Sequence, residues 1–477
     1  MAFYNQTYDK FLESTQSFCH NCNNISRLIE AQVVVKDNEV FLRKFCTECG
    51  EVWSKTSTDY EYYKMCNDFL KQPDLPEQAL TPVKHGCPWD CGVCEQHQNH
   101  PCLALFNVID ECNMRCNICY HMSEPGAGNP RSMQDIKKMH ETLLKVESEP
   151  DIIQVTGGEP TLHPEILDIL KYLKKGPVRH LMINTNGIRI SHDENFVKEL
   201  KKLGGGFEVY LQFDSLKSEA LKTIRNQDMR KIRQKALAML QKYNISTSLV
   251  CVIEKGVNDN EIEDLIQFAQ EQDCVRGIVF QPVQEAGRVQ ADGDFRITLS
   301  EIRQKVIDAN NSFTAADMIP LPCDPHKICV GYAAKTKKDG KVNILPVTGK
   351  IPREMITGQK GTIAFEQDKD FVKTVIDTVS LDTALSSSIV LKDKVKQQLF
   401  CCWPDFLAPK NMGYENVFRI VIMEFTDAYN FDSTNIKREC NFMIEPNKAI
   451  PFSTYNMIYG PKIEAIRKAK NRIQKKS

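Results

Sequence analysis

Short apolar runs alternate with amphipathic stretches from Leu103 to about residue 290, and this alternation limits the folds open to a chain of 477 residues. The apolar runs are expected to be strands, and they read LALFNVI, IIQVTG, HLMINTN, EVYLQFD, STSLVCVIE and GIVFQPV. Helical patterns lie between them, including MQDIKKMHETLLKV, PEILDILKYLKK and stretches that begin near Glu194, Glu219 and Asn260. Such a repeat favours parallel strands that curl partly or fully into a barrel, with functional loops at their C-terminal ends. We therefore predict an α/β fold built on a partial (β/α)6 TIM barrel.

The segments on either side of this barrel have different patterns, and four regions are predicted. Residues 1–60 form a four-cysteine metal-knuckle domain, and residues 61–102 form a linker with a further cysteine-rich segment. The barrel occupies residues 103–290, and residues 291–477 form an α+β C-terminal extension that includes the strand-like run FRIVIMEF. The last segment, EAIRKAKNRIQKKS, is expected to be a solvated basic helix or tail rather than a membrane- or partner-binding helix.

Charge and cysteine usage restrict the class of protein. The formal net charge is -1, from 61 basic and 62 acidic residues, so no global field favours nucleic acid. No window is apolar enough to span a membrane and the N-terminus has no secretory pattern, so we expect a cytoplasmic protein. Twelve of the 19 cysteines lie in the first 119 residues, mostly in CxxC or CxxxC groups. In such a protein these groups predict metal ligands rather than disulfides.

Three cysteines directly after the first predicted strand are the candidate catalytic centre. Cys112, Cys116 and Cys119 occur in ECNMRCNICY, so their thiolates are expected on the loop above that strand. Three thiolates leave one iron of a [4Fe-4S] cluster without a protein ligand, and S-adenosylmethionine (SAM) can chelate that iron. The alternative is a zinc site or three buried thiols.

The next strand ends supply candidate SAM contacts. After the second strand comes Thr-Gly-Gly-Glu-Pro, in which paired glycines permit close backbone approach and a carboxylate can meet a cationic amine. The third strand ends in NTNG, and the fourth places two polar side chains on one face of an apolar strand. The predicted cofactor-binding residues are Gly157, Gly158, Glu159, Pro160, Asn184, Asn186, Gln212 and Asp214. The alternatives are an ordinary turn at the glycines and an internal hydrogen-bond network for Gln212 and Asp214.

These motifs in this order resemble the radical SAM superfamily. The runs HGCPWDCGVCEQHQNHPCLALFNVIDECNMRCNICY, VYLQFDSL, VNDNEIEDLIQFA, FQPVQEAGR and EFTDAYNFD are similar to the tetraether lipid synthase-like family of archaea and its bacterial relatives, from about residue 15 onward. The resemblance implies a SAM-binding [4Fe-4S] cluster and reductive cleavage of SAM to a 5′-deoxyadenosyl radical. That radical would abstract hydrogen from an unactivated C–H bond, and in lipid synthases two lipid chains are then coupled through a C–C bond.

The resemblance also implies accessory metal sites. Cys19, Cys22, Cys46 and Cys49 would form a rubredoxin-like or zinc-ribbon-like site, with iron and zinc both open and a structural role as plausible as electron transfer. Cys87, Cys91, Cys94 and Cys102 would hold an auxiliary [4Fe-4S] cluster. Cys323, Cys329 and Cys440 would belong to a further cluster, but Ser453 stands where relatives carry a cysteine. Its fourth ligand is left open between Cys401, Cys402, Ser453 and a non-cysteine group.

Other functions fit the same core motifs. A radical SAM methyltransferase or a peptide- or pterin-modifying enzyme would share them, and a non-catalytic iron–sulfur or zinc protein would share the cysteines. We expect reduced ferredoxin or flavodoxin as the electron donor. A lipid substrate would bring the protein to the membrane periphery.

Overall fold

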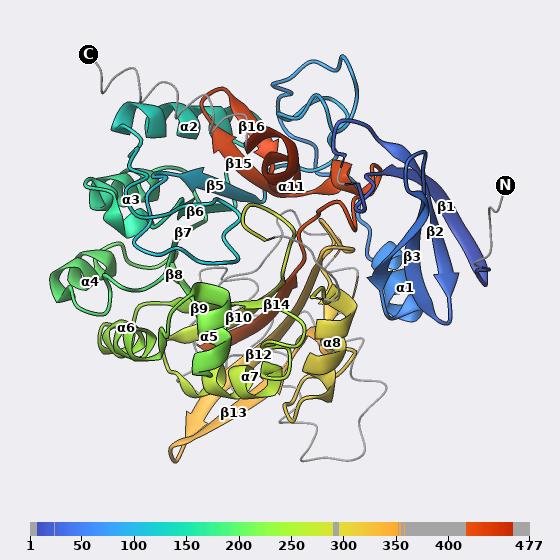
Figure 1. Ribbon diagram of the computed structural model, residues 1–477. Coiled ribbons are helices and arrows are strands. Elements are labelled where there is room, and N and C mark those ends of the chain that lie inside the picture. The colour runs from blue at the N-terminus through green and yellow to red at the C-terminus, as the bar shows by residue number, and fades with distance from the viewer. Residues whose placement is uncertain are drawn as a thin grey trace, which may run out of the picture.

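The computed structural model describes residues 7–22, 24–289, 295–351, 353, 357 and 416–460, and shows a small N-terminal sheet beside a larger α/β body (Figure 1). The small sheet is antiparallel and follows chain order: β1 (Lys10–Ser17), β2 (Ile29–Lys36), β3 (Glu39–Cys46) and β4 (Gly50–Ser57). Helix α1 (Tyr60–Asp68) follows, and it begins where the Asp59 side chain accepts from the Tyr62 amide.

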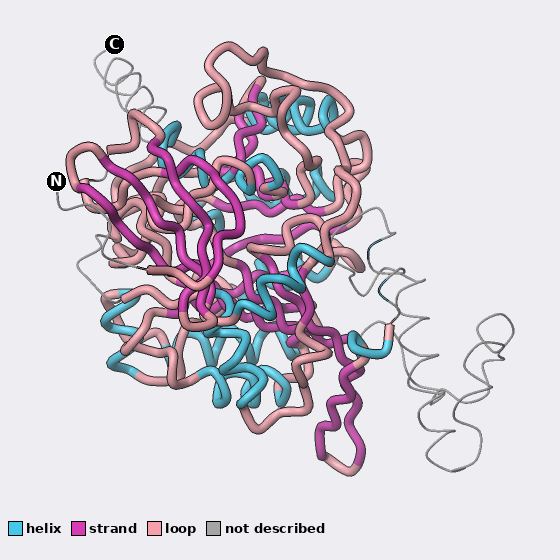
Figure 2. Tube along the Cα trace, turned by 90° about the vertical axis from the view of Figure 1, so that its right-hand side faces the viewer, coloured by secondary structure: helices cyan, strands magenta, loops and turns pink. Residues whose placement is uncertain are grey.

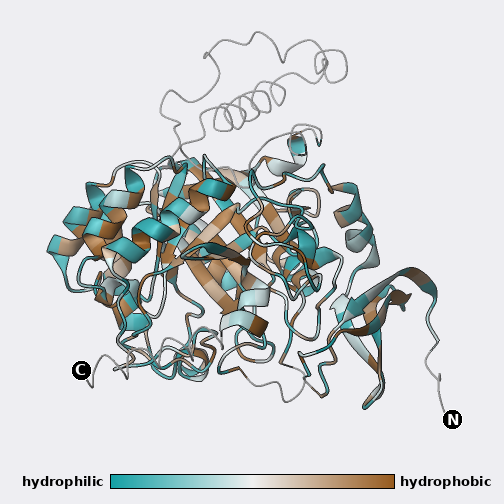
Figure 3. Cartoon of the chain, turned by 90° about the horizontal axis from the view of Figure 1, so that it is seen from above, coloured by the Kyte–Doolittle hydropathy of each residue, from teal (hydrophilic) through white to brown (hydrophobic). Residues whose placement is uncertain are grey.

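Six parallel strands form the centre of the body. They are β5 (Leu103–Asn107), β6 (Ile152–Thr156), β7 (His180–Thr185), β8 (Phe207–Gln212), β9 (Thr247–Ile253) and β10 (Val275–Pro282), each paired with the next. The helices between and after them are α2 (Met133–Val146), η1 (Pro160–Leu162), α3 (Ile166–Lys174), α4 (Glu194–Lys201), α5 (Ser218–Arg225), α6 (Arg230–Lys242), α7 (Ile262–Glu271) and α8 (Leu299–Asp308). Figure 3 shows the sheet as an apolar layer in the middle of the body, with helices packed outside it.

The C-terminal extension lengthens both edges of this sheet. Its strands are β11 (Ile319–Pro320), β12 (Ile328–Lys338), β13 (Lys341–Pro346), β14 (Val417–Met423), β15 (Asn441–Glu445) and β16 (Lys448–Pro451). Strand β14 pairs parallel to β10, whereas β15 pairs parallel to β5, so one segment of chain flanks the barrel on both sides. Figure 2 shows β12 and β13 as a long hairpin that projects from the body. The short helices η2 (Thr348–Lys350), η4 (Asn435–Arg438), α11 (Phe452–Thr454) and η5 (Tyr455–Tyr459) complete the described extension.

These observations confirm the predicted α/β class, the partial (β/α)6 barrel, the N-terminal knuckle and the α+β extension. Helix α2 coincides with the predicted stretch because Ser132 and Asp135 form a reciprocal capping box at its start. Its buried face includes Ile136, Met139 and Leu143, which pack into the core. Among the described residues no helix is long and apolar enough to cross a membrane.

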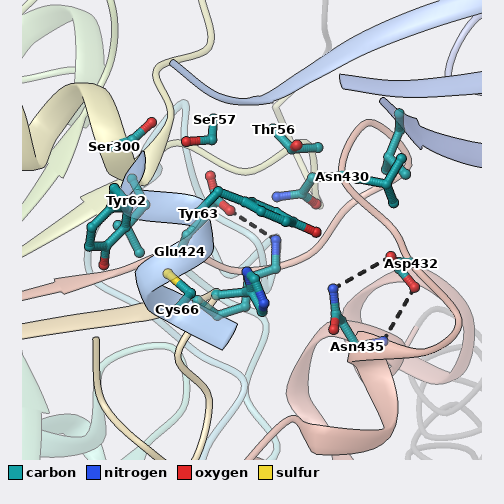
Figure 4. A pocket seen from close by; sticks show the side chains of 15 residues that line it. Thr56, Ser57, Tyr62, Tyr63, Cys66, Ser300, Glu424, Asn430, Asp432 and Asn435 are labelled. Carbon is teal, nitrogen blue, oxygen red and sulfur yellow. Dashed lines mark hydrogen bonds and ion pairs between the residues drawn. The ribbon is translucent and has the colours of Figure 1, made fainter. Parts of the chain in front are cut away.

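The N-terminal sheet docks onto the C-terminal extension through buried polar contacts. The Lys44 ammonium donates to the carbonyls of Phe18 (3.1 Å), Ala428 (2.7 Å) and Tyr429 (2.8 Å). A cavity of about 40 Å³ lies at this junction, where Tyr63 of α1 faces Asp432 of the extension (Figure 4). The small domain is therefore fixed to the residues between β14 and β15.

Candidate active site

The loop that follows β5 carries Cys112, Cys116 and Cys119. Cys112 and Cys116 are buried and Cys119 is half-buried. Burial raises the pKa of Cys112 to about 12, and the nearby carboxylate of Glu159 adds to this. In the described part of the chain, some possible metal ligands form compact groups in which all ligand atoms lie within 4.8 Å of one another. The three thiols do not form such a group. Their wider spacing suits thiolates that bind three different irons of one cluster rather than a single ion.

The paired glycines after β6 allow two loops to meet. A Cβ atom at Gly158 would overlap the carbonyl of Glu111, and one at Gly157 would overlap the carbonyl of Ile109. Two backbone hydrogen bonds stabilise this close approach. The Gly158 amide donates to the Ile109 carbonyl (2.7 Å), and the Glu159 amide donates to the Glu111 carbonyl (2.8 Å). The sequence suggests close approach to a ligand, but in the structure the partner is the cysteine-bearing loop itself. The next residue, Pro160, is buried as the first residue of η1.

The Glu159 carboxylate connects the loop after β6 to the end of β7. Its Oε1 accepts from the Thr161 hydroxyl (2.6 Å) and the Thr185 hydroxyl (2.7 Å), and its Oε2 accepts from the Asn186 amide (2.8 Å). The side chain is buried, and burial raises its pKa. The carboxylate is thus held beside Cys112 by several donors, which positions it for the predicted contact with a ligand amine.

The predicted polar residues of the third and fourth strands also meet beside this loop. Asn186 donates to Asn113 Oδ1 (2.7 Å), which connects the NTNG strand end to the cysteine loop. Gln212 donates to Asn184 Oδ1 (3.3 Å), so these two side chains are in contact across the neighbouring strands β7 and β8. The structure therefore brings Asn184, Asn186 and Gln212 to the end of the barrel that carries Cys112.

Asp214 has a different environment from the one expected. Its carboxylate is buried and accepts two hydrogen bonds from Arg225 (both 2.8 Å) and one from Arg233 (2.6 Å). Burial alone would raise its pKa, but these two guanidinium groups hold the pKa below its ordinary value. The side chain is engaged in an internal ionic network, the alternative named above, and the prediction of a SAM contact is corrected on this ground.

Two arginines and one glycine that were not predicted as site residues support the cysteine loop. Arg225 lies against the Cys116 thiol, and its own pKa is raised because the Asp214 and Cys116 interactions outweigh its burial. Arg288 donates to the Cys116 carbonyl (2.9 Å). Gly287 is needed because a side chain there would overlap the Cys119 carbonyl. Gly287 and Arg288 lie in the FQPVQEAGR run, which signalled a family resemblance, but only tertiary packing shows their contacts with the cysteine loop.

The accessory cysteines group differently from the pattern expected. Cys19, Cys22, Cys46 and Cys49 come together as one compact group, with 3.9 Å between the Cys22 and Cys46 sulfur atoms. Cys87, Cys91 and Cys94 line one small cavity together with Thr454. Cys102 lies in a compact group with Cys323 and Cys440 and does not line that cavity. The four-thiolate grouping of Cys87, Cys91, Cys94 and Cys102 stays a prediction.

Two further ligand candidates are also placed elsewhere. Cys329 on β12 is buried beside Tyr62 and Arg303, away from the compact group of Cys102. Ser453 donates to the Glu439 carboxylate (2.8 Å) and accepts from the Thr426 amide (3.0 Å). Cys401 and Cys402 lie outside the described residues.

Comparison with known proteins agrees with this geometry. A family model described as the radical SAM superfamily matches residues 106–269, and one described as the HMPTM N-terminal zinc ribbon domain matches residues 11–56. The chain is 30% identical to 7,8-dihydro-6-hydroxymethylpterin dimethyltransferase of Methanocaldococcus jannaschii, over 95% of each chain. It is 29% identical to GTP 3′,8-cyclase of Clostridium botulinum, over 51% of this chain and 73% of the relative.

Among solved structures, SuiB of Streptococcus suis bound to S-adenosylmethionine is similar with a TM-score of 0.35 and 18% identity, over 43% of this chain and 45% of that chain. The family matches and the full-length relative bear out the predicted enzyme and its cofactors, a [4Fe-4S] cluster, SAM and an N-terminal zinc ribbon. The chain belongs to the radical SAM superfamily and is a radical SAM enzyme.

Proposed function

We propose that this enzyme is a radical SAM methyltransferase that acts on a reduced hydroxymethylpterin. The observation that carries this proposal is the similarity to the pterin dimethyltransferase, which extends over 95% of both chains and so includes the zinc ribbon and the C-terminal extension. The GTP 3′,8-cyclase similarity covers only 51% of this chain. A relative that shares all parts of the chain is the better guide to the substrate class than one that shares about half.

In this proposal Cys112, Cys116 and Cys119 hold the SAM-binding cluster. When bound, the cluster and SAM together supply a 5′-deoxyadenosyl radical for hydrogen abstraction from a C–H bond. Glu159, which is held by several hydrogen-bond donors, is the proposed partner of the SAM amine, and Asn184, Asn186 and Gln212 are the proposed polar contacts for the rest of SAM. Gly157 and Gly158 hold the cysteine loop against this group of side chains.

The remaining chemistry is assigned to accessory groups. Cys87, Cys91 and Cys94 are proposed ligands of an auxiliary [4Fe-4S] cluster near α11. Cys19, Cys22, Cys46 and Cys49 are proposed zinc ligands of the N-terminal ribbon. Reduced ferredoxin or flavodoxin is the proposed electron donor. Lipid-chain coupling, which the sequence resemblance implies, is retained only as an outcome of the test below, since no contact among the described residues favours it.

The test is an anaerobic turnover assay with reconstituted full-length protein. We expect 5′-deoxyadenosine and a methylated product with 7,8-dihydro-6-hydroxymethylpterin, SAM and a reductant, both measured by mass spectrometry. SAM that carries a labelled methyl group shows whether the methyl comes from SAM. The proposal fails if 5′-deoxyadenosine and product form with a lipid chain or a peptide but not with the pterin.

A matched pair of cysteine variants tests the cluster assignment in the same assay. Cys116→Ala is expected to abolish SAM cleavage, because it removes one of the three thiolates. Cys274→Ala changes a buried cysteine directly before β10, at the opposite end of the parallel strands from the cysteine loop, and is expected to keep SAM cleavage within a few-fold of wild type. Equal activity of the two variants would contradict the assignment.

A further inference from the structure

Three buried cysteines from distant parts of the chain meet at the end of the barrel opposite the active site. The barrel-end cysteines are Cys102, Cys323 and Cys440, whose exposed fractions are 2%, 3% and 2%. Their sulfur atoms all lie within 4.8 Å of one another, and those of Cys323 and Cys440 are 3.6 Å apart. Chance burial of three lone thiols does not explain this convergence, since each comes from a different segment.

Their spacing fits a single tetrahedral ion. Thiolates at 2.3 Å from one ion are about 3.8 Å from each other, because the ligands point to the corners of a tetrahedron. The zinc ribbon in the same structure shows this spacing, with 3.9 Å between the Cys22 and Cys46 sulfur atoms. The three thiols of the active-site loop are spaced more widely, as thiolates on separate irons of a cluster would be. The barrel-end cysteines therefore match the ribbon and not the active-site loop.

The site lies where two parallel strands begin. Cys102 directly precedes β5 and Cys440 directly precedes β15, and the Leu103 amide donates to the Cys440 carbonyl (3.1 Å). Cys112 lies beyond the other end of β5, and five residues of strand span roughly 17 Å. An ion here would hold strand β15, which lies between β5 and β16, and the loop before β12 against β5. The N-terminal face of such a barrel serves stability rather than chemistry.

Neighbouring groups support one of these thiols. The His100 Nε2 atom lies 3.4 Å from the Cys102 sulfur, and its Nδ1 lies 2.6 Å from a carboxylate oxygen of Glu147. His100 and Asp151 form a compact group with Cys102 but are not part of the group of three thiols. Groups that hydrogen-bond to a metal ligand from outside the coordination shell orient that ligand. We assign His100 to positioning Cys102.

A small cavity borders two of the three cysteines and can admit a fourth ligand. It has a volume of about 40 Å³, borders Cys102 and Cys440, and is also lined by the polar side chains of Gln154, Tyr210 and Arg419. This volume exceeds the minimum needed for one water molecule, and the lining offers hydrogen-bond partners for it. Water can thus complete the tetrahedron from the barrel interior.

From these observations we propose that Cys102, Cys323 and Cys440 bind one zinc ion, with water as the fourth ligand, and that this ion fastens the C-terminal extension to the first barrel strand. This differs from the iron–sulfur cluster that the sequence resemblance implies for Cys323, Cys329 and Cys440. The ion is separate from that of the zinc ribbon, and its presence is measured without turnover, so the pterin proposal and this one can fail independently.

Metal analysis of paired variants is the primary test. Full-length protein purified without oxygen is assayed for zinc, iron and acid-labile sulfide per chain. Cys323→Ala is expected to lose one zinc while iron and sulfide stay at the wild-type level. Cys329→Ala, its matched control on β12, is expected to lose nothing because its thiol faces Tyr62. The proposal is overturned if Cys323→Ala loses iron with sulfide, if it loses no metal, or if Cys329→Ala loses as much.

A spectroscopic test leaves all three barrel-end cysteines unchanged. In a Cys46→Ser, Cys49→Ser protein the ribbon ion is removed, and zinc-edge X-ray absorption then reports the remaining ion. We expect three sulfur neighbours and one oxygen or nitrogen, and four sulfur neighbours or no zinc would refute the site. His100→Ala is expected to weaken zinc about 10- to 100-fold in chelator competition while three sulfur neighbours are kept at saturating zinc. Unchanged affinity would remove His100 from its positioning role.

Discussion

Arg225 connects an internal carboxylate to the active-site loop. It is buried, makes both hydrogen bonds to Asp214 at 2.8 Å, and lies against the Cys116 thiol. Its charge offsets the negative charge of the buried Asp214 carboxylate, and the same guanidinium contacts Cys116. Cys116 is thereby positioned by a residue that need not touch SAM.

Arg225→Met should be strongly destabilising for this reason. It leaves the buried Asp214 carboxylate with a single guanidinium partner, and loss of one partner from a buried ion pair costs about 3 to 5 kcal/mol. The free energy of unfolding in urea measures the effect. Arg230→Met is the control, because Arg230 pairs with Asp228 on the surface with half of its own side chain exposed. Solvent screens such pairs, so they contribute little to stability. If both variants lose a similar amount of unfolding free energy, the buried Asp214 network stabilises the fold no more than a surface ion pair does.

His140 predicts a pH dependence that is independent of the metal sites. It is buried on α2 with its Nδ1 atom 3.2 Å from the Tyr172 hydroxyl, and burial lowers its pKa. The unfolded chain therefore binds this proton more readily than the folded protein. The stabilising effect is complete above the ordinary histidine pKa of about 6.5 and is lost as the pH falls below it, by at most about 1.4 kcal/mol per pH unit. Urea unfolding from pH 7.5 to 5 should show this slope in wild type and a smaller slope in His140→Gln. Equal slopes would contradict the assignment.

At the scale of residues, sequence spacing identified the parts of the site that are local in the chain. Cys112, Cys116 and Cys119 lie within eight residues, so one loop carries all three whatever the rest of the fold does. Sequence spacing could not group Cys102 correctly in space. Its spatial neighbours Cys323 and Cys440 lie more than 200 residues further along the sequence. Proximity in sequence to Cys94 favoured different partners.

The two loops that build the active site form one element of structure. The glycine pair after β6 packs on residues 109–111 of the cysteine loop, and Glu159 follows directly. Any side chain at Gly158 must push the loops apart, since its Cβ would meet backbone atoms of Glu111 and Asp110 that cannot rotate away.

Gly158→Ala is accordingly expected to disturb the active site more than the fold. Overpacking of this kind costs about 1 to 3 kcal/mol and would displace the cysteine loop. We expect a large loss of cluster iron after reconstitution, and of SAM cleavage, with the barrel still folded by circular dichroism. Gly205→Ala is the control because a Cβ there would meet nothing within 4 Å. Retention of full iron content in Gly158→Ala would show that the loops tolerate the added methyl group.

Most barrel elements could be predicted because each carries its own pattern. The six apolar runs coincide with β5 to β10, and the predicted helix at MQDIKKMHETLLKV coincides with α2. Helix α6 was not predicted, since α5 ends at Asn226 in a left-handed conformation and a second helix begins four residues later without an N-terminal cap hydrogen bond. The pattern therefore lacks a start signal at this point.

At the scale of the whole molecule, the chain after the barrel returns to both edges of the sheet. Strands β14 and β15 are separated by 17 residues yet pair with β10 and β5, the last and first barrel strands. Apolar patterning indicates that such segments are strands but contains no information on which edge they join. The segment between these two strands spans the open side of the barrel, and it is also the surface on which the N-terminal sheet docks.

This docking depends on one buried lysine. Burial lowers the pKa of Lys44 to about 7, and its ammonium reaches the carbonyls of Ala428 and Tyr429 between β14 and β15. Lys44→Met leaves these carbonyls buried without that donor, and each unsatisfied group costs about 1 to 3 kcal/mol. The zinc ribbon should then detach from the extension more often while its own metal site stays intact.

Hydrogen exchange measures this detachment directly. Lys44→Met is expected to speed amide exchange in β1 and in residues 428–433, whereas the amides of β6 to β9 keep their wild-type protection because they belong to the barrel core. Lys55→Met is the matched control, since Lys55 lies in the same sheet but its ion pair with Glu39 is partly exposed. If both variants exchange alike, the domain is held by the apolar contacts around Phe18 and Phe431, and the buried lysine is dispensable for docking.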